Sequence, residues 1–187
     1  MTRPTRLRRL VVGVAVAAAA AASPMAQTAG ASSADIDTSR IEPPVGNRAF
    51  FAAHAIGVQI YTCTATSTGT AWTLLAPRAT LYDEKGKVVA THFAGPTWEA
   101  RDGSRVVGKR LDGITVDPSA IQWLLIKGDS WSVGADGDRL TATTFVQRLN
   151  TTGGLPPAAD TCDAEAVGHT AESQYTADYT FWRADHV

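Results

Sequence analysis

Gly57-Val58-Gln59-Ile60-Tyr61-Thr62-Cys63-Thr64 is the stretch in which side chains alternate most regularly along this chain of 187 residues. Successive side chains of a β-strand point to opposite faces of a sheet, so a period of two with β-branched and aromatic residues predicts a strand. One face carries Val58, Ile60 and Thr62, and the other carries Gln59, Tyr61 and Cys63. We therefore place the first strand at 57–64.

Short stretches of the same kind continue through the rest of the chain. Turn-forming residues separate them, among them Ser67–Thr70 and the loop Asp83–Lys87. Pro77 is expected to end the run that follows the first turn, and 121–127 is expected to be a central strand buried on both faces. No window of eleven or more residues after the N-terminal region has a convincing helical period, and the only weak helix candidates are 118–121 and 164–169. Many short strands with Gly and Pro turns predict an all-β fold, a single-domain antiparallel sandwich or barrel with long irregular loops. The further predicted strands are 71–75, 79–82, 88–93, 105–111, 121–127, 140–149 and 174–182.

The N-terminal region has the layout of a secretory signal peptide. Arginines precede an apolar run at 10–22, and small residues follow it. The run is shorter than the roughly 20 residues that span a bilayer as a helix, so no membrane span is expected, with a membrane anchor as the alternative. We predict a signal peptide over 1–26 with its cut between 22 and 34, a flexible lead over 27–44, and one β domain over 45–187. The protein is thus expected to be secreted.

Charge and cysteine content narrow the function classes. Without the arginines of the predicted signal, 13 basic residues face 18 acidic ones, a formal net charge of −5. An acidic secreted domain is a poor partner for nucleic acid, so none is expected. Cys63 and Cys162 are the only cysteines, and an isolated pair in an oxidising compartment indicates one disulfide. Two free thiols or a metal site are the alternatives.

The segment 92–104, His-Phe-Ala-Gly-Pro-Thr-Trp-Glu-Ala-Arg-Asp-Gly-Ser, combines chemical side chains with rigid turn residues. A Gly95-Pro96 turn is expected to hold His92 and Trp98 on one accessible face. Glu99 and Asp102 complete the predicted binding residues. Tryptophan rings stack well on sugar faces, so the predicted ligand is a glycan or a cell-wall component. No cofactor is expected.

An enzyme is the alternative hypothesis. His92, Glu99 and Asp102 could converge as a metal-dependent or hydrolytic centre if the turn folds the segment back, with His54 or His169 arriving from elsewhere. For nucleophilic catalysis the candidate is Ser104, but it lies in Asp-Gly-Ser, where side chains more commonly bond the backbone of a turn. The zinc motif HExxH and the GxSxG of serine hydrolases are both absent.

The chain as a whole resembles a family of secreted bacterial and fungal proteins known as domain of unknown function 3455. The resemblance covers about 50–182 and implies a secreted single domain with a cysteine pair at these positions. It implies no activity. Some fungal members carry a dehydrogenase label, but no GxGxxG follows a strand here. The stretches that carry the resemblance are GVQIYTC at 57–63, APRATLYD at 76–83, 92–104, IQWLLIK at 121–127, RLNTTGGLPP at 148–157 with Cys162, and YTADYTFW at 175–182.

These observations favour a secreted binding domain without catalytic activity. Its rigid loop face would be built from 92–104, with 150–157 as a second contributor.

Overall fold

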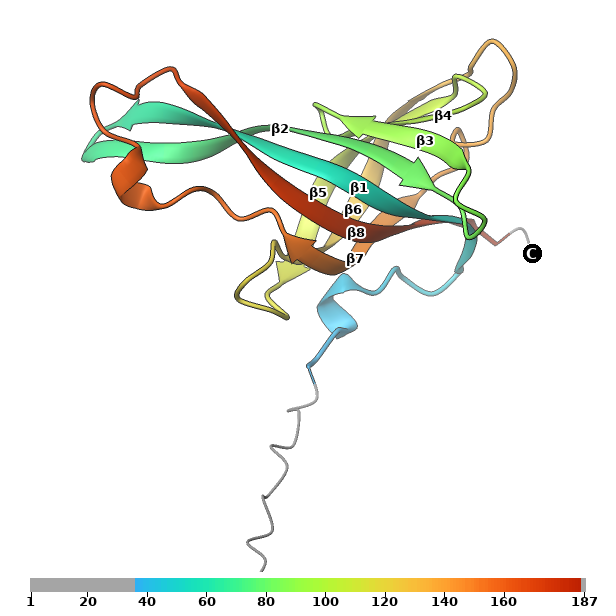
Figure 1. Ribbon diagram of the computed structural model, residues 1–187. Helices are drawn as coiled ribbons and strands as arrows, with labels where there is room; N and C mark the ends of the chain where they lie inside the picture. The colour runs from blue at the N-terminus through green and yellow to red at the C-terminus, as the bar shows by residue number, and fades with distance from the viewer. Residues whose placement is uncertain (1–35, 186–187) are drawn as a thin grey trace, which may run out of the picture. The chain divides into compact units, whose positions relative to one another are not determined.

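The computed structural model describes residues 36–185, in which eight strands form one antiparallel sheet closed into a barrel (Figure 1). The strands are β1 (Asn47–Thr66), β2 (Gly69–Tyr82), β3 (Val88–Phe93), β4 (Thr97–Ala100), β5 (Arg105–Ile114), β6 (Trp123–Ser132), β7 (Phe145–Gly153) and β8 (Thr170–Ala184), with 3₁₀ turns η1 (Ser39–Ile41) and η2 (Ala159–Thr161). Each strand pairs with the next in sequence, and β8 pairs with β1 to close the ring. The predicted all-β fold is confirmed, as a barrel. The predicted signal over 1–26 and residues 27–35 of the predicted lead lie outside the described residues.

The main core fills the inside of the barrel. In β8 the inward side chains are Tyr175, Ala177, Tyr179 and Phe181, none more than 2% exposed. They alternate with polar side chains that face outward, as the period-two pattern of 174–182 predicted. Trp98 of β4 packs among them and is 1% exposed. Burial of these aromatic rings is the largest apolar contribution to this core.

A smaller core lies where the chain enters the domain. Ile41 of η1 is 1% exposed and clusters with Ile114 and with Leu125 of β6. The carbonyl of Ile41 also accepts a hydrogen bond from Nε2 of Gln147 at 2.7 Å. Ordered packing therefore begins before 45, and the expected flexible lead is too long at its C-terminal end. At residues 124–126, η1 covers one side of β6 and the barrel interior covers the other, as predicted, whereas Lys127 at the end of the predicted strand is exposed.

β1 and β2 form a long hairpin that carries the disulfide. Cys63 is bonded to Cys162, which follows η2, and the predicted disulfide is confirmed. The expectation that Pro77 ends a strand is wrong, because β2 continues through it to Tyr82. Pro77 lies in the part of β2 that has no β3 neighbour, and an edge strand tolerates a missing N–H.

The start of β7 differs from the sequence prediction, and the helix content bears on the question of a membrane span. The strand predicted over 140–149 begins only at Phe145, because residues 140–142 form a turn in which Leu140 is fully buried. No helix within residues 36–185 has the length and apolarity needed to cross a membrane.

Candidate functional site

The β3–β4 hairpin holds the segment that the sequence singled out, and it turns two of its rings inward. His92 and Trp98 are directly opposite each other in the pairing of β3 with β4. Their rings stack at a centroid distance of 4.3 Å with an interplanar angle of 9°, and they are 3% and 1% exposed. The expectation of an accessible face carrying both rings is therefore wrong. The same alternation instead turns Phe93 and Thr97 outward.

Burial fixes the chemistry of His92. Its Nδ1 lies 2.8 Å from the backbone oxygen of Thr97, and because a carbonyl only accepts, Nδ1 carries the hydrogen. The pKa of His92 is lowered to about 3, mainly by desolvation; the bond to Thr97 opposes this shift, and the positive charge of Arg148 adds to it. The imidazole is accordingly neutral at physiological pH. It acts as a packed ring of the core.

The two carboxylates of the segment, Glu99 and Asp102, do not contact His92, and each bonds a different set of local partners. Oε2 of Glu99 accepts from Nε of Arg105 at 2.6 Å on the outer surface. Asp102 accepts from the backbone N–H of Ser104 and of Arg139, both at 2.9 Å. Burial of Asp102 opposes the change, but these bonds and that of the Ser104 hydroxyl lower its pKa. Both groups stabilise local structure.

The structure does not bring His92, Glu99 and Asp102 together, so the expected metal-dependent or hydrolytic centre is not assembled there. Within residues 36–185 no group of three or more His, Cys, Asp or Glu side chains is placed to hold a metal ion. Ser104 is fully buried, and its Oγ donates to Asp102 at 2.6 Å and accepts from the N–H of Leu140 at 3.1 Å. Its place in a turn agrees with the sequence reading.

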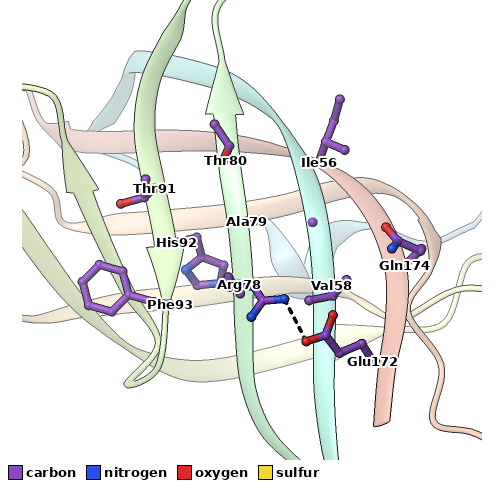
Figure 2. Close-up of a pocket in the computed structure, with 11 residues that line it drawn as sticks. Ile56, Val58, Arg78, Ala79, Thr80, Thr91, His92, Phe93, Glu172 and Gln174 are labelled. Carbon is purple, nitrogen blue, oxygen red and sulfur yellow. Dashed lines mark hydrogen bonds and ion pairs between the residues drawn. The ribbon is translucent and has the colours of Figure 1, made fainter.

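The outer face of the sheet is hollowed beside this hairpin. The hollow, which we call the outer-face groove, has a volume of about 470 Å³ and crosses strands β3, β2, β1 and β8 (Figure 2). The groove is lined mainly by the outward-facing side chains of these strands, which alternate along each strand with the buried, inward-facing ones. They are Ile56, Val58, Arg78, Thr80, Thr91, Phe93, Glu172 and Gln174. The inward residues Gly57, Ala79 and His92 also line it.

An ion pair spans the groove. Arg78 of β2 reaches across β1, and its Nη2 lies 2.8 Å from Oε1 of Glu172 on β8 (Figure 2). Val58 lies between these strands and is only 6% exposed although it faces outward. The aliphatic stem of the arginine can cover such a side chain while its charged end stays in water. Donors and acceptors are thus held side by side in an open, partly apolar surface.

A second, smaller hollow continues the outer-face groove past β3. It has a volume of about 250 Å³ and shares Phe93 with the groove. Its other outward side chains come from β4, β5 and β6. They are Thr97, Arg105, Val107, Ser130 and Ser132, and Trp131 also lines it at 47% exposure. Phe93 is therefore the aromatic residue between two adjoining hollows.

The outer face also carries a row of polar side chains on β1, β8 and β7, and the sequence did not predict that these side chains meet. Nδ1 of His54 lies 2.7 Å from Oδ1 of Asp178, whose Oδ2 accepts from Nδ2 of Asn150 at 2.8 Å. Asn150 is the one residue other than glycine with a positive φ, 49°, in the described part of the chain, and it lies in a bulge of β7. The row borders a hollow of about 390 Å³ that Tyr82 also lines. His54 and Asp178 are 124 residues apart, and no local pattern links them.

Comparison with known proteins returned one finding. A family model described as "Protein of unknown function (DUF3455)" matches residues 44–183. No curated protein and no solved structure matches the chain.

Proposed function

The chain belongs to the DUF3455 family, which assigns no activity, and we propose that it is a secreted binding domain without catalytic activity that holds a neutral glycan chain in the outer-face groove. The proposal rests on Phe93, a partly exposed aromatic ring placed between two adjoining hollows. A flat apolar ring is suited to pack against the C–H face of a sugar. Hollows on both sides of the ring would accommodate a chain that continues past it.

The polar groups of the groove suit hydroxyl ligands. A sugar hydroxyl both donates and accepts, so it needs donors and acceptors close together. Arg78 supplies donors and Glu172 supplies acceptors, and their ion pair cancels the net charge of the surface. Gln174 and Thr80 add an amide and a hydroxyl. A neutral ligand fits this balance better than a polyanion does.

The predicted location supports the same reading. A signal peptide over 1–26 would deliver the domain to an oxidising compartment, and the Cys63–Cys162 disulfide is of the kind that persists there. Polysaccharides of the cell envelope and its surroundings are among the ligands of that location.

Binding to a glycan array, with pull-down on insoluble cell-wall polysaccharide, tests the proposal. We expect Phe93→Ala and Arg78→Ala to lose binding while both stay folded, because Phe93 is only partly buried and the exposed ion pair of Arg78 contributes about 0–1 kcal/mol to stability. Arg40→Ala is the matched control, since it removes the exposed Arg40–Asp112 ion pair away from the groove. Equal binding by wild type and Phe93→Ala contradicts the groove, and no binding to any glycan contradicts the ligand class.

A second candidate function, hydrolysis, is favoured by the His54–Asp178 pair. With Nδ1–H donated to the carboxylate, Nε2 of His54 keeps its lone pair and can accept a proton from water that attacks an ester or glycoside. Asn150, in a left-handed backbone conformation that asparagine tolerates, donates to the other oxygen of this carboxylate. A screen of chromogenic esters and glycosides decides this candidate: activity that His54→Ala abolishes supports it, and activity equal in both proteins excludes it.

A further inference from the structure

The hairpin end of β2 has no strand on the side away from β1. β2 pairs with β1 along nearly its whole length, but with β3 only from Ala79 to Tyr82. Figure 1 shows the ribbon of β1, β2 and β8 running on beyond β3. Within residues 36–185 no other strand pairs with the stretch 69–78. The stretch is therefore an open edge of the sheet, with backbone N–H and C=O groups free to pair.

This edge has little of the usual protection against strand pairing. Proteins commonly place charged side chains, proline or bulges on edge strands. From 69 to 76 the edge has no charged residue, and the protection is limited to Pro77 and Arg78 at one end and a bulge near Leu75. Leu74 and Leu75 are 55% and 58% exposed on this edge. Such a strand is suited to pair with another extended, uncharged strand.

We propose that β2 pairs antiparallel with β2 of a second copy of this chain, about a two-fold axis at Thr73. In this register Trp72 of one copy lies opposite Leu74 of the other, and the reverse pair forms on the far side of the axis. Cross-strand pairs of an aromatic and an aliphatic residue stabilise antiparallel sheets. The indole N–H of Trp72 already donates to Oγ1 of Thr161 at 3.0 Å, which fixes the ring in the isolated copy.

A second copy fits this edge better than a different protein would. A two-fold axis places each residue of the strand against its own sequence reversed, so any charge would meet the same charge nearby. The stretch 55–77 contains no charge that would be repelled, and none that would select a partner of opposite charge. The two-fold axis at Thr73 places the apolar Trp72 of each copy opposite the apolar Leu74 of the other. The edge is thus self-complementary in charge and in side-chain type.

The size of the contact sets the expected affinity. A paired stretch of about nine residues spans roughly 30 Å, and a single sheet is about 10 Å thick, so each copy contributes on the order of 300 Å². Stable interfaces bury about 800 Å² on each partner. The dimer is therefore expected to be weak and to form in proportion to concentration.

Sedimentation equilibrium of the exported protein, over a hundredfold range of concentration up to about 1 mM, tests the proposal. We expect the wild type to shift from monomer to dimer. Leu74→Lys should weaken association at least tenfold, because it removes the apolar Leu74 side chain opposite Trp72 and brings the ammonium groups of the two copies close together across the axis. Leu111→Lys is the matched control, since Leu111 is a leucine of β5 with a similar exposure of 53%.

Cysteine cross-linking is a second test of the dimer that does not depend on the lysine variants. Both native cysteines are in the disulfide, so an introduced thiol is the only free one. Thr73→Cys should form a covalent dimer under mild oxidation, and Thr68→Cys in the turn of the same hairpin should not. A wild type that stays monomeric over the whole range, a Thr73→Cys that cross-links no more than Thr68→Cys, or equal association of the two lysine variants would each overturn the proposal.

Discussion

Lowering the pH should weaken the fold through His92, and the magnitude follows from its burial. The pKa of this imidazole is about 3 in the folded chain, against 6.5 as its ordinary value. A group with a depressed pKa takes up its proton in the unfolded chain first, so the free energy of unfolding falls as the pH drops below 6.5 and keeps falling towards 3. Between pH 7 and pH 5 the loss from this one residue is about 2 kcal/mol.

His92→Asn isolates this contribution. The asparagine amide does not titrate, and it can still donate to the backbone oxygen of Thr97. The variant is expected to be less stable than the wild type at every pH, because it loses the stack on Trp98. Its free energy of unfolding should, however, fall by about 2 kcal/mol less between pH 7 and pH 5, since all other titrating groups are shared.

Urea unfolding followed by tryptophan fluorescence at pH 7, 6 and 5, at constant ionic strength, measures both proteins. The quantity to compare is the change in free energy of unfolding with pH, which cancels the constant cost of the substitution. Equal losses in the wild type and in His92→Asn would refute the claim that a neutral, desolvated His92 lies in the core.

Three further variants test other parts of the account. Trp98→Ala removes a ring that is 1% exposed, and calorimetry should show a loss of about 3–5 kcal/mol; a loss below about 1 kcal/mol would contradict its central place in the barrel. Replacing Cys63 and Cys162 together by serine should cost about 2–5 kcal/mol in chemical unfolding, and an unchanged midpoint would show that the disulfide contributes little. Gly57→Ala would drive a Cβ into the backbone oxygen of Arg78, so we expect a lowered melting temperature with disturbed pairing of β1 and β2, and a wild-type melting curve would show that the strands are not this close.

Much of the sheet could be predicted from side-chain alternation, but its closure could not. The period of two in 57–64 and 174–182 identified the middle of β1 and of β8, because these strands have one buried and one open face. Closing the barrel depends on pairing β1 with β8, which are more than 100 residues apart in sequence, and no local pattern encodes that pairing. Pro77 misled the strand assignment because its tolerance depends on the absence of a neighbouring strand.

The structure places the side chains of the predicted site differently from the sequence expectation, since His92 and Trp98 are buried and Phe93 of the same segment lines the outer-face groove. Alternation states that His92 and Phe93 face opposite sides, but it does not state which side is the interior. β4 has only four residues, too few to show a period, so the burial of Trp98 had no sequence signature. His54 and Asp178 meet only because β1 and β8 are neighbours in the closed sheet.

Binding at the outer-face groove is the central claim, and an NMR titration tests it most directly. Neutral β-linked hexasaccharides, namely cellohexaose, xylohexaose and chitohexaose, would be added to the ¹⁵N-labelled protein. The account predicts that at least one of them shifts the amide signals of Phe93, Thr80 and Gln174 together, and that Phe93→Ala removes these shifts. Shifts confined to the surroundings of His54 and Asp178, or no shifts with any of the three, would contradict it.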